Sequence, residues 1–165
     1  MAGVTFNFLT KEPIGDCPDA LARVWSVQHW VNTLDRVKQA TLREQSQDQQ
    51  VFDLHFDAGG ETVDKVTVLR TRSKHRISVK HLVPPPGIDA LSGAWWVDPE
   101  QPDTLYASRQ MTMSPEQATV ARARNVQKIL RENITALLRD TTLETTVQVA
   151  MPVQKAQDTL LRKEA

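Results

Sequence analysis

The sequence has only one cysteine, Cys17, among its 165 residues. A disulfide within the chain is therefore excluded, and a reducing compartment is favoured. Twenty basic residues balance twenty acidic ones, so the charge gives no indication of a nucleic-acid or anionic-membrane partner. No apolar run approaches about 18 residues, and the first residues lack a basic-then-apolar leader. We therefore expect a cytoplasmic protein with no nucleic acid and no membrane among its partners.

Motifs for metal and nucleotide chemistry are also lacking. The four histidines are not at metal-binding spacings, and there is no cysteine–histidine cluster, glycine-rich phosphate loop or GxSxG sequence. Cys17 stands beside Pro18 without a base placed to activate it, which argues against a thiol nucleophile. The sequence therefore predicts no metal site and no organic cofactor.

The longest helical pattern in the chain runs from Ser114 to Asp140. Ser114, Pro115 and Gln117 form a predicted N-terminal cap. Apolar residues then recur at helical spacing, at Val120, Ala123, Val126, Leu130, Ile134, Leu137 and Leu138. No second helix of this length is available to cover the apolar stripe, so we expect a sheet to cover it.

The preceding chain is dominated by strand patterns. A first strand, Val4 to Leu9, is followed by two short helical segments, one carrying Leu21 to Val27 and one from His29 to Val37. Asp16 or Asp19 is the expected cap of the first segment. Further strands are predicted at Lys38–Glu44, Val51–Asp57, Val63–Arg72, His75–Val83, Gly93–Val97 and Leu105–Met113. Ala58, Gly59 and Gly60 supply a hairpin turn, and Pro84 to Gly87 must be a loop.

These elements predict an α+β protein with one domain at residues 1–140. Sequential strands with short turns form an antiparallel meander, here of about seven strands, with two short helices after the first strand. We expect the sheet to curve around the long C-terminal helix and to leave a cavity between them. Residues 141–165 form a tail that the pattern does not place, although Val153 to Lys163 could be a short helix.

Four polar residues interrupt the apolar faces of these elements. Arg70 continues the face of Val66 and Val68, and His81 lies between Val79 and Val83. Arg109 lies between Ala107 and Met111, and Asn125 lies at the edge of the helical stripe. A buried charge without a partner costs several kcal/mol, and no acidic residue shares these faces. A neutral polar ligand or trapped water is therefore the expected partner.

Structural explanations of the same residues stay open. Arg70 is near a strand end and could reach solvent, His81 could be a hydrogen-bonded core histidine, and Asn125 could bond a loop carbonyl. Arg109 is the hardest to explain in this way, because apolar residues flank it on both sides. The four tryptophans could belong to the core or to the wall of a ligand cavity.

With this architecture, the chain resembles the SRPBCC superfamily, whose members share the helix-grip fold of START lipid-binding domains. Within it, the chain is most similar to bacterial aromatic-polyketide aromatase/cyclases, from about Val4 to Arg139. The run Val27-Gln28-His29-Trp30 resembles the family's helix-loop tryptophan segment. The run Arg122 to Ile129 resembles its final-helix segment, in which an asparagine, here Asn125, faces the cavity.

The resemblance, together with the faces of the predicted elements, implies site residues. Catalytic roles fall to Arg70, His81 and Arg109. Substrate contacts fall to Trp30, Phe56, Val66, Val68, Trp95, Asn125 and Ile129. An ungapped match places Leu69 where the family has its ketone-polarising arginine, but the alternation turns Arg70 inward, so Arg70 takes that role. Val63, Lys65 and Val37 replace family aromatic residues, which indicates a different substrate or activity.

The resemblance also implies a function. We expect a polyketide aromatase/cyclase that directs aldol cyclisation and dehydration of a poly-β-ketone in the cavity. The substrate would arrive tethered to an acyl carrier protein, and a homodimer is kept open. The alternative is a non-catalytic carrier of a hydrophobic ligand such as lipid, quinone or polyketide product. A stability or partner-interaction module would be favoured if no continuous cavity exists.

Overall fold

The structure, a computed structural model, describes residues 3–15, 19–57, 63–139 and 152–153. Its strands are β1 (Val4–Pro13), β2 (Val37–Gln45), β3 (Gln49–Asp57), β4 (Val63–Arg72), β5 (Arg76–Val83), β6 (Ala90–Asp98), β7 (Gln101–Met113) and β8 (Pro152–Val153). Its helices are α1 (Ala20–Trp25), α2 (Val27–Thr33) and α3 (Val120–Leu137). Two short helices follow β1 as the sequence predicted, and α3 lies within the predicted long helix, Ser114 to Asp140.

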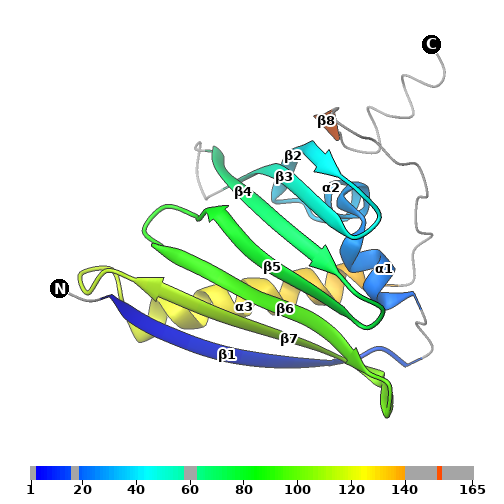
Figure 1. The fold of residues 1–165 in the computed structure, drawn as a ribbon. Helices are drawn as coiled ribbons and strands as arrows, with labels where there is room; N and C mark the ends of the chain where they lie inside the picture. Colours follow the sequence, from blue (N-terminus) through cyan, green and yellow to red (C-terminus); the bar gives the residue numbers. More distant parts are fainter. Residues whose placement is uncertain (1–2, 16–18, 58–62, 140–151, 154–165) are drawn as a thin grey trace.

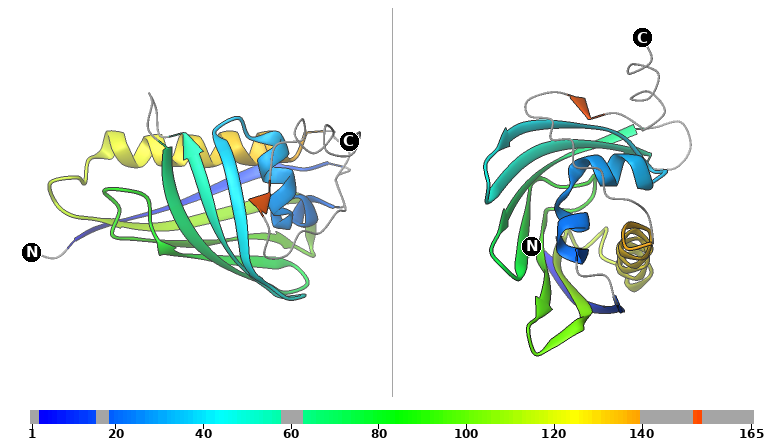
Figure 2. Two further views of the ribbon diagram at one scale, coloured as in Figure 1. Left: turned by 90° about the horizontal axis from the view of Figure 1, so that it is seen from above. Right: turned by 90° about the vertical axis from the view of Figure 1, so that its right-hand side faces the viewer.

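The strands form one antiparallel sheet in the order β1-β7-β6-β5-β4-β3-β2-β8. The seven longer strands are those expected, although several extend further than the alternation indicated. The two-residue strand β8 pairs with Ala40 and Thr41 of β2. Figure 2 looks along α3 in its right-hand view and shows the sheet curving around the helix. The predicted α+β architecture, a curved antiparallel sheet around one long helix, is confirmed (Figure 1).

The predicted start of the long helix is wrong. Ser114 does not cap α3, because its carbonyl accepts hydrogen bonds from the amides of Gln117 and Ala118 and closes a separate turn. The N-cap is Thr119, whose hydroxyl accepts a hydrogen bond from the Arg122 amide at 3.1 Å. The helix therefore begins where the apolar stripe begins, at Val120, because the preceding residues form that turn.

Two apolar clusters hold α3 on the sheet. The main cluster joins α1, α2 and the second half of α3 to the sheet, and includes Trp95, Ala107 and Leu130. The second cluster lies at the start of α3 and contains Ile88, Leu91, Met111, Met113 and Ala123. Phe8 of β1 packs against both clusters. The inner face of the sheet is thus divided into two apolar regions.

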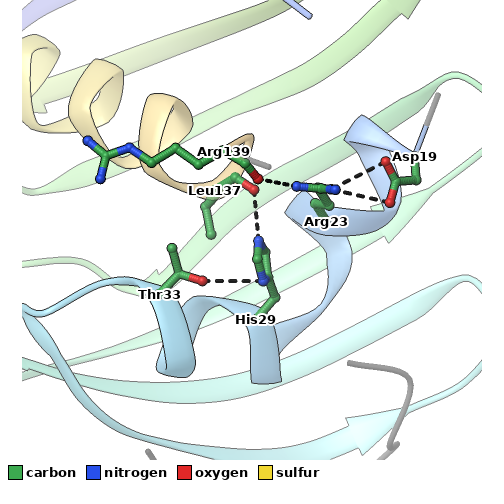
Figure 3. A network of polar contacts seen from close by, with 6 residues as sticks. All are labelled: Asp19, Arg23, His29, Thr33, Leu137 and Arg139. Atoms are coloured by element: carbon green, nitrogen blue, oxygen red, sulfur yellow. Dashed lines mark hydrogen bonds and ion pairs between the residues drawn. The ribbon is translucent and has the colours of Figure 1, made fainter. Parts of the chain in front are cut away.

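The C-terminal end of α3 is fixed by polar side chains of the short helices (Figure 3). His29 Nε2 contacts the Leu137 carbonyl oxygen at 2.7 Å, and Arg23 donates to the Arg139 carbonyl. Arg23 also pairs with Asp19 at 3.2 Å. Terminal carbonyls have no partner within the helix itself, so these contacts satisfy them and fasten α3 to α1 and α2.

The N-terminal end of α3 is held by the loop after β5. Arg122 donates to the Pro86 carbonyl at 2.9 Å and to Gln117 Oε1 at 2.5 Å. Gly87 has φ +83°, and a Cβ there would lie 2.3 Å from the Arg122 guanidinium. The loop therefore needs glycine both for its backbone conformation and for this close approach.

Several expectations fall outside the described residues. These are the environment of Cys17, the cap role of Asp16, the turn at residues 58–60, and the short helix expected in the tail beyond Val153. The division into a domain at 1–140 and a tail at 141–165 stays a prediction.

Candidate functional site

The candidate site lies between the two apolar clusters, on the inner face of the sheet. The strand register puts Arg70, Val79, Gly93, Arg109 and Phe8 in one row across β4, β5, β6, β7 and β1. Arg109 comes between Ala107 of the main cluster and Met111 of the second cluster. A cation therefore occupies the position at which the two apolar regions meet.

Arg109 is only 7% exposed, and its guanidinium lies 4.2 Å from the centre of the Trp95 ring. Within the described ranges it donates one hydrogen bond, from Nη1 to the Ser108 carbonyl at 2.7 Å. A guanidinium has five N–H donors, so most of its hydrogen-bonding capacity is not used by the protein. Gly93 makes room for it, because a Cβ there would lie 2.9 Å from Arg109 Nη1 and 2.0 Å from the Ser108 carbonyl oxygen.

Two further polar atoms beside Arg109 lack partners. Trp95 is 2% exposed, and its indole N–H finds no acceptor among the residues described. His81, on β5 opposite Val68, has a buried Nδ1 that likewise has no partner there. Buried polar atoms in native proteins are normally hydrogen-bonded, so unpartnered ones indicate a ligand or water. We call Arg109, Trp95 and His81 the Arg109 site.

The electrostatics of the Arg109 site are set by burial and by positive charge. Burial lowers the pKa of Arg109 to about 9, which leaves it charged at neutral pH. Burial, and then the charge of Arg109, lower the pKa of His81 to about 4, so this imidazole is neutral at pH 7. No carboxylate in the described part of the chain forms an ion pair with Arg109 or Arg70. The site therefore carries uncompensated positive charge.

Arg70, the other predicted catalytic arginine, lies within the main cluster and is 1% exposed. Its guanidinium donates to the carbonyls of Val24 and Trp25, both at 2.7 Å, and to Gln50 Oε1 at 2.9 and 3.1 Å. The pKa of Arg70 is lowered to about 9, mainly by burial and to a lesser extent by the charges of Arg109 and Arg72. Arg70 thus caps the C-terminal carbonyls of α1, where a cation is favourable.

Gln50 is a buried residue that the sequence analysis missed. It is 2% exposed, accepts from Arg70, and donates to the Trp25 carbonyl at 3.0 Å. Its position on β3 alternates with Phe52 and Leu54, so it is another polar residue on an apolar face. The predicted strand began at Val51, one residue too late to include it.

The other predicted substrate-contact residues divide into two groups. Trp30, Trp95, Val66 and Val68 come together: the two indole rings meet edge to face at 5.9 Å, and both valines are buried. Phe56 is partly buried at the end of β3 near β2 and packs against the main cluster.

The two predicted residues on α3 lie away from its buried face. Asn125 is exposed and Ile129 is half-buried, whereas Ala123, Leu130, Ile134 and Leu137 form the buried face. The structure therefore does not bring Asn125 to the Arg109 site, because the helical turn carries it past the buried stripe.

Two pockets lined by described residues lie elsewhere. One, of about 440 Å³, runs along the outer side of α3, and the other, of about 700 Å³, lies at the end of the sheet beside α1. Neither is lined by Arg70, His81 or Arg109. Several inward residues near the Arg109 site are nevertheless only partly buried, namely Phe8, His81, Gly93 and Val126. The covering by α3 is therefore incomplete.

The described residues contain no group of three or more His, Cys, Asp or Glu side chains that could hold a metal ion. In the same residues, no helix is long and apolar enough to cross a membrane.

No protein-family model and no curated protein matches this sequence. Solved structures do match. The di-domain ARO/CYC BexL from the BE-7585A biosynthetic pathway is 25% identical with a TM-score of 0.67, over 81% of this chain and 48% of BexL. The Zhui aromatase/cyclase from Streptomyces sp. R1128 is 16% identical with a TM-score of 0.67, over 82% of this chain and 92% of that one.

A third similar structure has another activity. Norcoclaurine synthase from Thalictrum flavum is 12% identical with a TM-score of 0.60, over 84% of this chain and 87% of the synthase. Together these neighbours show that the chain has the helix-grip fold of the SRPBCC superfamily, as the sequence predicted. The chain spans about half the length of BexL. The shared fold includes enzymes with different reactions, so the activity must be argued from the site.

Proposed function

We propose that the protein is a polyketide aromatase/cyclase that folds a poly-β-ketone chain along the inner face of the sheet and directs its first ring closure. The observation that carries the proposal is the Arg109 site, where a buried cation with unused donors adjoins an unpartnered indole N–H. At neutral pH the unpaired groups of Arg109 and Trp95 are hydrogen-bond donors. The unpaired nitrogen of His81 belongs to a neutral imidazole. A chain rich in carbonyl oxygens supplies the matching acceptors.

The chemistry follows from this arrangement. A poly-β-ketone reacts readily once one of its enol carbons is held against one of its ketone carbons, and fixing a single pose lowers the entropic barrier. Arg109 and the Trp95 N–H would stabilise the oxygen that gains negative charge as the carbon–carbon bond forms. His81, neutral at pH 7, would accept the proton lost from the nucleophilic carbon and pass it to the new alkoxide. It would then take the second proton of that carbon and give it to the hydroxyl group, which leaves as water.

The apolar surroundings suit such a substrate. Val66, Val68 and Trp95 are buried in the main cluster and Trp30 packs against it, so the Arg109 site adjoins apolar and aromatic side chains. The substrate would arrive as a thioester on an acyl carrier protein, and no cofactor is needed. Arg70 would act by holding α1, and with it the Trp25 and Trp30 side of these apolar surroundings.

The test uses a synthetic poly-β-ketone thioester and measures the ratio of its cyclised products by chromatography and mass spectrometry. The native protein should enrich one ring pattern, and Arg109→Met should lose this selectivity. Arg76→Met is a matched control, because Arg76 is an exposed arginine whose guanidinium lies 5.3 Å from the Trp96 ring centre. Equal product ratios with and without native protein would refute the cyclase proposal.

A carrier of a hydrophobic acidic ligand is the second candidate. It is favoured because the Arg109 site has hydrogen-bond donors in excess, which would hold a finished phenolic product as well as a substrate. A carrier would bind such a phenol tightly, through Arg109, without changing the products formed from the thioester. The same two variants therefore separate the candidates when phenol binding and product ratio are measured together.

A further inference from the structure

The larger of the two pockets, of about 700 Å³, is separate from the Arg109 site. It is lined by residues of α1, of the β2–β3 and β4–β5 turns, and of the adjoining ends of β6 and β7. Helix α1 contacts β5 and β6, and Figure 1 shows α1 at this end of the sheet. Its floor is apolar and includes Ile14, Ala20, Ile77 and Val97. A hollow of this size with an apolar floor is typical of a small-molecule site.

The rim of this end pocket is polar and carries an excess of positive charge. Arg72, Lys74 and His75 line one side. Asp19 and Asp48 also line the pocket, but Asp19 forms an ion pair with Arg23 at 3.2 Å. In the described part of the chain, neither Arg72 nor Lys74 forms an ion pair, so two cations stand against the single carboxylate of Asp48.

Arg72 is held in place for such a role. Its Nε donates to the Gln47 carbonyl at 2.7 Å, and its guanidinium lies 4.5 Å from the centre of the Trp25 ring. On the same ring, the guanidinium of Arg70 lies at 5.4 Å. Both arginines thus contact the ring of Trp25, which belongs to the main cluster, and the end pocket borders that cluster through Ile77. Arg72 keeps its two terminal nitrogens available, because only its Nε has an acceptor among the described residues.

We propose that the end pocket is a second ligand site, which takes an amphiphile with an apolar body and one acidic head group. The body would lie on the Ile77 and Val97 floor, and the carboxylate, sulfonate or phosphate would meet Arg72 and Lys74. Guanidinium groups pair with these anions in a planar, two-point geometry. This site is independent of the reaction at Arg109.

The test uses 8-anilinonaphthalene-1-sulfonate, an aromatic body with one sulfonate, and follows its fluorescence on titration. The native protein should bind two molecules, one at each site. Ala22→Trp, a change at an exposed alanine that lines the end pocket, should remove one molecule. Ala121→Trp, at an exposed alanine of α3 outside both pockets, is the matched control and should leave both. Arg109→Met should remove the other molecule.

Charge-reversal variants and a neutral probe test whether the end pocket prefers an acidic head group. Lys74→Glu should raise the Kd of the end pocket about fivefold or more, whereas Lys80→Glu, at an exposed lysine outside both pockets, should not. A neutral probe, N-phenyl-1-naphthylamine, should bind the end pocket more weakly than the sulfonate. Identical stoichiometry for the two tryptophan variants would overturn the second site. Equal binding of the neutral and sulfonated probes would overturn the acidic head group. Native chemical shifts in both tryptophan variants would show that they fold.

Discussion

Arg70 and Arg109 are both arginines and lie in the same row of the sheet, yet their hydrogen-bond partners differ. Both are buried, and burial lowers the pKa of each to about 9. Arg70 meets three oxygen acceptors, the carbonyls of Val24 and Trp25 and the Gln50 amide. Arg109 meets one, a carbonyl of the adjacent residue.

The difference shows that burial of a charge does not by itself identify a functional residue. A cation surrounded by fixed oxygen acceptors already has its hydrogen bonds, and its removal takes a donor from each of those acceptors. A cation with few acceptors retains binding capacity that a ligand can use. Arg70 is therefore expected to act on stability and Arg109 on binding, and the following experiments test that separation.

The largest effect is expected from Arg70→Met. The change leaves Gln50 Oε1 without a donor, which costs about 1–3 kcal/mol. It also removes one of two donors from the carbonyls of Val24 and Trp25, which keep the Trp30 indole N–H and the Gln50 amide. The free energy of unfolding should therefore fall by roughly 3 kcal/mol. Guanidinium chloride unfolding measures it, with Arg109→Met as the control. An equal loss of stability in both variants would erase the proposed difference between the two arginines.

Arg109→Met should have the next largest effect, on activity and not on folding. Loss of a donor that stabilises developing negative charge costs about 100-fold in rate, so selective cyclisation of the thioester should fall by about that factor. Its free energy of unfolding should change by less than about 1 kcal/mol, because few protein acceptors lose their donor. A variant that is inactive only because it is unfolded would contradict this expectation, and circular dichroism detects that case.

The pH dependence of stability should report the Arg109 side of the molecule. The pKa of His81 is about 4 in the folded protein and about 6.5 when unfolded, so between these values the unfolded chain binds a proton that the folded one does not. The full free energy of unfolding is therefore reached above pH 6.5. It decreases as the pH falls, by about 2 kcal/mol at pH 5.

His81→Leu should remove this acid-side loss, and Arg109→Met should reduce it, because the arginine charge is the second cause of the lowered pKa. Unfolding curves collected from pH 7 to pH 5 measure the slope. Arg70→Met serves as the comparison, since Arg70 is not among the causes of the His81 shift. The same slope in native protein and His81→Leu would refute the assignment.

The smallest effect is expected from Gln50→Leu. It removes one acceptor from Arg70 and one donor from the Trp25 carbonyl, while the other Arg70 contacts stay, so stability should fall by about 1–2 kcal/mol. Binding of the naphthalene sulfonate at the Arg109 site should be unchanged. A loss of binding there would mean that the two arginine sites are coupled and not separate.

The sequence predicted much of this fold, because alternation reports which face of a strand is buried. Arg109 between Ala107 and Met111 was correctly expected to point inward, and Arg70 likewise. The same method failed at element ends. It began β3 at Val51 and so missed Gln50, and it began the long helix at Ser114, where a turn forms instead.

The alternation of apolar and polar residues along a strand could not indicate the hydrogen-bond partners of its buried side chains. Arg70 meets carbonyls of α1, and no local pattern on β4 indicates where a separate helix ends. Asn125 shows the opposite failure, because it lies near the apolar stripe in sequence but is exposed in the structure. Hydrogen-bond partners depend on tertiary packing, so the different roles of the two arginines became visible only in three dimensions.

The two ends of α3 are held by different numbers of buried contacts, and this affects how a ligand could reach the interior. Leu137 and Arg139 are tied to buried groups of the short helices, whereas Val120 at the other end is 60% exposed and its neighbour Arg122 holds only a surface loop. Weakly buried ends open first in local fluctuations. We therefore expect the Val120 end of α3 to move away from the sheet while the Leu137 end stays in place. A ligand would enter and leave beneath the Val120 end.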